Sequence, residues 1–269
     1  MNHWSGQPVP YGVESQVFLS RAPEGKLLVF VHGYTGKAVK TWEEFDSLIP
    51  QDDFFKGYDV LFYGYPGFRS NVIAGAALLC EMLEELHGNP GLLIQSLGIG
   101  NSRPKLTSYD QITLVGHSLG SLLIRWALVI ASKEKGMGWK KADPRFVLFA
   151  PAHSGNLLET ALGELQSSVS WISMAGAALG ILSPFLKELA PGSPVLLGLR
   201  EEVKQESSGD VNFFARKVVI AELDQVVSNL PFPGDPMPIA MRGKGHIDVC
   251  KPEAGAYERP LEILKEVLK

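Results

Sequence analysis

The sequence is poor in cysteine and has none of the spacings typical of metal sites. Its two cysteines, Cys80 and Cys250, lie far apart, and neither belongs to a C-x-x-C motif. Disulfide scaffolds and structural zinc sites need several cysteines or histidines at short, regular spacing. We therefore expect two free thiols and no bound metal.

Long basic runs are also missing. The chain has 25 Lys and Arg residues against 29 Asp and Glu residues, and its net charge is -4. A surface that binds nucleic acid needs a basic stripe or patch. The composition therefore argues against nucleic acid as a partner and leaves small-molecule substrates open.

Neither the first residues nor the apolar runs indicate export or a membrane span. Residues 1–8 lack the basic start and the apolar stretch of a secretory signal, which predicts a cytoplasmic protein. The most apolar stretch, residues 171–182, is shorter than the roughly 20 residues that a membrane helix needs.

The length and the order of apolar patterns predict one α/β domain over residues 1–269. Six short apolar runs predict strands at residues 27–31, 58–63, 112–115, 145–149, 217–221 and 238–241. Helical patterns alternate with them, among them residues 73–86, 119–130 and 261–268. This alternation predicts a mostly parallel, doubly wound sheet flanked by helices, and residues 9–19 are expected to add an early antiparallel edge.

The sequence Gly-His-Ser-Leu-Gly at residues 116–120 carries the clearest chemical signal. It follows a predicted strand and opens a predicted helix, which is the context that a G-x-S-x-G nucleophile turn requires. The two glycines allow the strand and the helix to approach closely while the serine oxygen stays exposed. Ser118 is therefore predicted to be a nucleophile.

A serine nucleophile needs a histidine base and a carboxylate that orients it, in the chain order serine, acid, histidine. Only His153 and His246 follow Ser118 in the sequence. His246 lies in a polar, glycine-rich loop just after a late predicted strand, where sites of parallel sheets are built. We predict that His246 is the base.

Asp224 is the favoured acid because it follows the predicted strand 217–221 after two intervening residues. Three other carboxylates compete for the role. Glu222 lies at the strand end, Asp210 lies before the strand, and Asp248 follows His246 too closely to reach round it easily.

The oxyanion of a tetrahedral intermediate needs preorganised amide donors. One donor is predicted at the amide of Leu119, directly after the nucleophile and at a helix start. The second is predicted at the amide of Tyr34, in the turn that follows the first core strand. His32 in the same turn is expected to brace the loop rather than to transfer protons.

Residues 157–199 depart from the alternation of strands and helices and are unusually apolar. They are read either as a buried helical segment or as a cap or lid over the site. A cap would offer an apolar wall to an acyl chain and exclude water.

These segments together resemble the α/β-hydrolase superfamily over most of the chain. Residues 29–33 look like its oxyanion strand and turn, residues 116–120 like its nucleophile elbow, residues 224–227 like its acid loop, and residues 245–246 like its base. The resemblance implies the α/β-hydrolase fold with a helical cap insertion.

Two further stretches are similar to lipase-like serine esterases. Residues 150–155 resemble the Pro-His-x-Gly stretch after the sixth core strand, and residues 189–196 resemble a segment near the lid of those lipases. An alanine lies inside the first stretch, and Ser121 follows the elbow where many lipases have another glycine. The resemblance implies a lipase or a related esterase.

The expected function is hydrolysis of carboxylic esters with an apolar acyl group, without a cofactor, through an acyl-enzyme on Ser118. A thioesterase, an amidase or an acyltransferase would use the same triad, and a non-catalytic ligand-binding protein would keep the same fold. Dehalogenases and epoxide hydrolases normally have a carboxylate at the nucleophile position, so Ser118 argues against them. Transient contact of the cap with a membrane surface is a further possibility.

Overall fold

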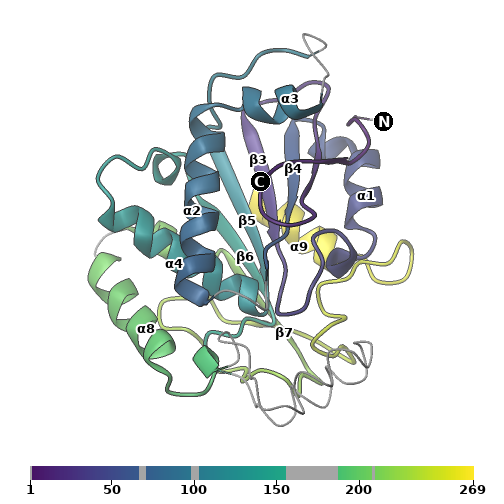
Figure 1. The fold of residues 1–269 in the computed structure, drawn as a ribbon. Coiled ribbons are helices and arrows are strands. Elements are labelled where there is room, and N and C mark those ends of the chain that lie inside the picture. The colour runs from purple at the N-terminus through teal and green to yellow at the C-terminus, as the bar shows by residue number, and fades with distance from the viewer. Residues whose placement is uncertain (1, 67–70, 98–102, 156–186, 208–209) are drawn as a thin grey trace.

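The computed structural model describes residues 2–66, 71–97, 103–155, 187–207 and 210–269 (Figure 1). Its described strands form one eight-stranded sheet in the order β1-β2-β4-β3-β5-β6-β7-β8. The strands are β1 (Gln7–Pro8), β2 (Gln16–Phe18), β3 (Lys26–Val31), β4 (Tyr58–Tyr63), β5 (Gln111–His117), β6 (Arg145–Phe149), β7 (Lys217–Ala221) and β8 (Ile239–Met241).

Strands β3 to β8 are parallel, whereas β1 and β2 pair antiparallel at one edge. The six predicted core strands are therefore confirmed, and three of them have the predicted bounds. Of the antiparallel edge predicted at residues 9–19, only β2 is a strand, and β1 lies just before this range, because the chain turns between them. Gly12 and Glu14 in this turn both have positive φ, of 63° and 55°.

Helices cover both faces of the sheet. They are α1 (Phe45–Gln51), α2 (Val72–Gly88), α3 (Gly91–Leu97), α4 (Leu119–Lys133), α8 (Pro194–Glu206) and α9 (Arg259–Leu268), with short 3-10 turns at Lys40–Trp42, Asp53–Phe55, Trp139–Lys141 and Val211–Phe213. Figure 1 shows α2 and α4 in front of the strands and α9 behind them. The three predicted helices are confirmed, and the arrangement is the predicted doubly wound one.

The core lies where the central strands are covered on both faces. Every residue of β4 is buried, and the rings of Phe30 and Phe62 stack with their centroids 4.7 Å apart. One charged group, Asp59, is enclosed in β4. Its carboxylate accepts hydrogen bonds from Arg103 Nη1 at 2.7 Å, Arg103 Nη2 at 2.8 Å and the Tyr109 hydroxyl at 2.7 Å. Burial of Asp59 is thus compensated by a two-pronged ion pair.

Most of the candidate cap, residues 157–186, lies outside the described residues. The described remainder contains the buried Leu189 and the start of α8, whose first turn is capped by the Ser193 hydroxyl. Gly155 packs directly on Pro191, because a Cβ at Gly155 would lie 3.0 Å from Pro191 Cα. The chain just before the candidate cap is therefore in contact with Pro191 in its described remainder. Among the helices described, none has the length and apolar character to cross a membrane.

Candidate active site

Ser118 lies at a sharp turn between β5 and α4. Its backbone has φ 51° and ψ -120°, a conformation that non-glycine residues adopt only when the surrounding structure enforces it. The Ser118 amide donates to the Phe149 carbonyl at 3.0 Å, and the Ser118 carbonyl accepts from the Ala152 amide at 3.3 Å. The loop after β6 therefore holds the strained turn on both sides.

Two glycines create the space for this turn. A Cβ at Gly120 would lie 2.0 Å from the Val31 carbonyl oxygen and 2.6 Å from that of His32, so only glycine lets α4 approach β3. A Cβ at Gly33 would lie 2.9 Å from the Cβ of Ser118. The turn after β3 is thus in direct contact with Ser118, and Tyr34, the predicted oxyanion donor, is the residue after Gly33.

Asp224 and His246 are brought together by the loops that follow β7 and β8. His246 Nδ1 lies 2.9 Å from Asp224 Oδ2, and the two side chains are 7% and 0% exposed. The other carboxylate oxygen of Asp224 accepts from the amides of Val226 at 2.9 Å and Val227 at 3.1 Å. Three hydrogen bonds, shared between both carboxylate oxygens, therefore fix the orientation of Asp224.

This geometry sets the charge and the tautomer of the pair. Burial alone would raise the pKa of Asp224, but the hydrogen bond with His246 and the two backbone amides hold the pKa below its usual range. An ionised carboxylate can only accept, so Nδ1 of His246 carries the proton. In a neutral imidazole with this tautomer, Nε2 is the acceptor that a serine hydroxyl requires.

Two of the three competing carboxylates have other partners. Glu222 accepts from the Gly243 amide at 2.9 Å, and Asp210 pairs with Lys140 at 3.2 Å. His153, the other histidine after Ser118, has its Nε2 3.1 Å from the Leu230 carbonyl. Burial lowers the pKa of His153 to about 3, which makes it a poor base.

His117 joins the turn at Ser118 to the loop that carries His246, a contact that the sequence did not predict. Its Nε2 lies 2.9 Å from the carbonyl oxygen of His246, and the two imidazole centroids are 5.0 Å apart. Burial lowers the pKa of His117 to about 3, so the ring is neutral. The only signal in the sequence was its place beside Ser118 in the motif, which does not reveal where the side chain points.

The turn after β3 is braced by His32. Its Nδ1 donates to the Gly33 carbonyl at 2.8 Å, and its Nε2 accepts from the Tyr65 amide at 3.4 Å. The rings of His32 and Tyr65 stack at 4.4 Å, and the Tyr65 hydroxyl donates to the His32 carbonyl at 2.8 Å. Burial lowers the pKa of His32 to about 4, which suits the bracing role expected for it. Leu119, the other predicted donor, opens α4, where the first amides have no acceptor within the helix.

The fold of this chain is similar to those of solved lipases and esterases. The TM-score is 0.56 against the propeptide form of lipase BlEst2 from Bacillus licheniformis, at 16% identity over 98% of this chain and 53% of that chain. Against the mature form it is 0.53, at 15% identity over 97% and 96%. A carboxylesterase of the thaumarchaeon Nitrososphaera gargenis gives 0.52 at 12% identity, over 98% and 96%. The chain has the α/β-hydrolase fold.

The present chain spans about half of the propeptide form of the lipase and nearly all of the mature form. No protein-family model matches the sequence, and comparison with curated proteins gives no match. In the α/β-hydrolase fold, the nucleophile, the acid and the base follow one another in that order along the chain. Ser118, Asp224 and His246 have this order and follow β5, β7 and β8.

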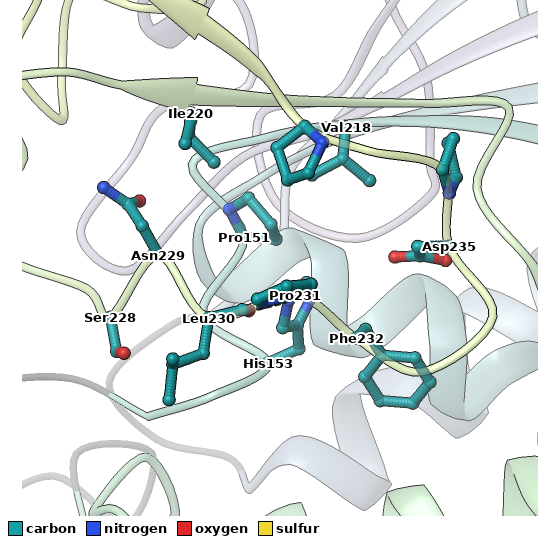
Figure 2. A pocket seen from close by; sticks show the side chains of 12 residues that line it. Pro151, His153, Val218, Ile220, Ser228, Asn229, Leu230, Pro231, Phe232 and Asp235 are labelled. Carbon is teal, nitrogen blue, oxygen red and sulfur yellow. Dashed lines mark hydrogen bonds between the residues drawn. The ribbon is translucent and has the colours of Figure 1, made fainter.

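A small pocket of this α/β-hydrolase fold lies between β7 and the loop 228–238 (Figure 2). Val218 and Ile220 line one side, and His153 and Pro231 lie across from them. Its volume of about 10 Å³ is at the lower limit for a single water molecule. The pocket is therefore too small for a substrate, and the three triad candidates do not line it. Within the described ranges, no cluster of three or more His, Cys, Asp or Glu side chains is arranged to hold a metal ion.

Proposed function

We propose that the protein is a serine hydrolase that cleaves carboxylic esters through an acyl-enzyme on Ser118. The observation that carries the proposal is the buried pair of Asp224 and His246, whose loop is hydrogen-bonded to the residue next to Ser118. A pair with this tautomer supplies the base that a serine hydroxyl needs.

The proposed reaction has two halves. The Oγ of Ser118 attacks the ester carbonyl carbon while Nε2 of His246 takes the hydroxyl proton. The tetrahedral intermediate collapses, the bond to the alcohol breaks, and His246 returns the proton to the departing alcohol oxygen. In the second half, water attacks the acyl carbon while His246 takes a proton from it. The bond to Ser118 then breaks, His246 returns the proton to the Ser118 oxygen, and the acid is released.

The charges that form in this reaction have proposed partners. The carboxylate of Asp224 stabilises the imidazolium of His246, and the amides of Leu119 and Tyr34 stabilise the oxyanion. The helix dipole of α4 adds to the effect at Leu119, because its positive end lies at the nucleophile turn. No step of this scheme requires a cofactor.

The similarity to a lipase and a carboxylesterase supports ester over thioester or amide substrates, and a small molecule with an apolar acyl group is the substrate we propose. The acyl preference and any contact with a lipid surface are attributed to the candidate cap at residues 157–199. A panel of p-nitrophenyl esters of rising chain length tests this preference. Activity confined to the shortest esters would contradict it.

Labelling with a fluorophosphonate probe tests the nucleophile directly. We expect covalent labelling of the native protein and none of Ser118→Ala. Ser121→Ala is the matched control, because this neighbouring hydroxyl is buried in α4 without a hydrogen-bond partner. Labelling should persist in that variant. A correctly folded native protein that takes up no probe would contradict the hydrolase and favour a ligand-binding protein with the same fold.

A further inference from the structure

The side chain of His117 forms a direct connection between the nucleophile turn and the backbone of the base. Its Nε2 is 2.9 Å from the His246 carbonyl oxygen, and the two rings are inclined by 46° with centroids 5.0 Å apart. A carbonyl oxygen only accepts hydrogen bonds, so Nε2 of His117 carries the proton. The contact joins residues that are 129 positions apart in the chain.

The imidazole of His117 is held rigidly from several sides. His117 is the last residue of β5, and it is paired with Phe149 of the neighbouring strand β6. The ring of Trp42 packs edge-on against it, with centroids 6.4 Å apart and planes inclined by 78°. Gly33 completes the enclosure, because a Cβ at that position would come within 3.1 Å of His117 Nδ1. The donor therefore points in one direction only.

The loop that carries His246 has further anchors on both sides of it, among them the Val249 amide, which donates to the Gly245 carbonyl at 3.2 Å. Glu222 accepts from the Gly243 amide at 2.9 Å, and the Leu223 amide donates to the Lys244 carbonyl at 3.0 Å. These contacts hold Gly243, Lys244 and Gly245, the three residues before His246. His117 acts on His246 itself, at the carbonyl of the residue whose imidazole bonds to Asp224.

A neutral His117 also suits the charge that His246 acquires. In the proposed reaction His246 becomes an imidazolium, and a second cation 5.0 Å away would oppose it. Burial lowers the pKa of His117 to about 3, so its ring remains an uncharged donor throughout the working pH range.

We propose that His117 is a positioning residue, whose Nε2–H holds the His246 carbonyl so that the imidazole faces Ser118 while it stays bonded to Asp224. The inference rests on the proposed function and deepens it. His117 touches no reacting atom. It acts through His246, and loss of its hydrogen bond releases the backbone that sets the distance between base and nucleophile.

Three substitutions separate the hydrogen bond from size and polarity. His117→Gln places a side-chain amide near the position of Nε2 and keeps the donor. His117→Asn is also polar, but its amide reaches only to the position of Nδ1 and cannot meet the His246 carbonyl. His117→Leu removes the donor and retains an apolar side chain. The comparison of Gln with Asn remains decisive even if the Leu variant does not fold.

The kinetic readout is turnover of a p-nitrophenyl ester together with the rate of fluorophosphonate labelling. A shift of about 1 Å in a reacting group can cost roughly 100-fold in rate. We expect kcat of His117→Asn and His117→Leu to fall by about 10- to 100-fold with little change in KM, and the labelling rate to fall in parallel. His117→Gln should restore most of both rates. Equal rates in the Gln and Asn variants would overturn the proposal.

A second readout does not depend on catalysis. The proton on Nδ1 of His246, which is hydrogen-bonded to Asp224, should give a downfield proton NMR resonance. We expect a sharp resonance in the native protein and in His117→Gln, and a broadened or absent one in His117→Asn. If the native protein takes up no fluorophosphonate, the proposed hydrolase fails, and this resonance still decides the role of His117. An unchanged resonance in the folded Asn variant would overturn that role.

Discussion

Asp224 and His246 meet at 2.9 Å, although 22 positions separate them in the chain. The reason lies in the sheet. Strands β7 and β8 are parallel neighbours, so the loops at their carboxyl ends emerge side by side. Asp224 lies in the first of these loops and His246 in the second. The pairing of β7 with β8 therefore brings Asp224 and His246, the proposed acid and base, to the same edge of the sheet.

Replacing Asp224 by Asn should lower ester turnover by roughly 10³- to 10⁴-fold, because an amide favours the wrong tautomer of the base. The oxygen that accepts from Val226 and Val227 is preserved in this variant, so the loop should keep its shape. Steady-state kinetics at neutral pH measure the effect. Asp210→Asn is the matched control, since that carboxylate pairs with Lys140, and it should be nearly as active as the native protein. Near-native turnover in Asp224→Asn would move the acid role to Glu222.

The free energy of unfolding should fall as the pH drops below about 6.5, the ordinary pKa of histidine. Burial lowers the pKa of His153 and His117 to about 3 and that of His32 to about 4. Between these values and 6.5 the unfolded chain binds protons that the folded protein does not. Each such histidine then makes the slope of stability against pH steeper by about 1.4 kcal/mol per pH unit.

His153→Gln tests this linkage away from the triad candidates. The Gln amide can still donate to the Leu230 carbonyl, but it does not titrate. Urea unfolding at pH 6 and pH 4.5 should show a slope shallower by about 1.4 kcal/mol per pH unit. Ser154→Ala is the control, because the Ser154 hydroxyl donates to the same carbonyl and has no charge. That variant should lose equal stability at both pH values, and an unchanged slope in His153→Gln would contradict the prediction.

Gly120→Ala should destabilise the fold by about 3 kcal/mol or more, since overpacking commonly costs 1–3 kcal/mol and here the obstacle is rigid backbone. The added methyl would lie 2.0 Å from the Val31 carbonyl oxygen. Thermal unfolding measures the loss. Gly88→Ala, at the end of α2, is the matched control because nothing lies within 4 Å of its added Cβ. A Tm for Gly120→Ala equal to that control would refute the close approach of α4 to β3.

Arg103→Met should cost about 3–5 kcal/mol of stability, because it leaves the enclosed Asp59 carboxylate without its counter-ion. Both side chains of this pair are 0% exposed. Lys37→Met removes one partner of an exposed pair with Glu14 and should cost at most about 1 kcal/mol. Chemical denaturation of the two variants provides the comparison. Equal losses would show that Asp59 does not depend on Arg103.

Sequence patterns predicted the parts of this fold that depend on local periodicity. The runs at residues 58–63, 145–149 and 217–221 became strands with those bounds, because continuous branched and aromatic residues suit a strand buried on both faces. The pattern at the amino end was harder to interpret. There the chain turns through Gly12 and Glu14, so the predicted range 9–19 holds one short strand, β2, and a second short strand, β1, lies before it.

Side-chain direction was the part that sequence could not supply. Asp224 and Glu222 have the same charge and lie two residues apart. Their spacing from the strand favoured Asp224 as the acid but did not exclude Glu222. In the structure, Asp224 is enclosed against His246, whereas Glu222 accepts from the Gly243 amide. His117 was missed altogether, because its role depends on a contact across 129 positions.

The sequence by itself determined the order of strands and helices and the place of Ser118 at a turn between them, because periodicity and glycine spacing are local properties. Only the tertiary structure showed which carboxylate is hydrogen-bonded to His246. It also showed that the His117 side chain is hydrogen-bonded to the backbone of His246. Those contacts form because β5, β7 and β8 are parallel, so the loops at their carboxyl ends lie at the same edge of the sheet although they are distant in the chain. Hydrogen-bond geometry then selects one side chain among several of the same chemistry.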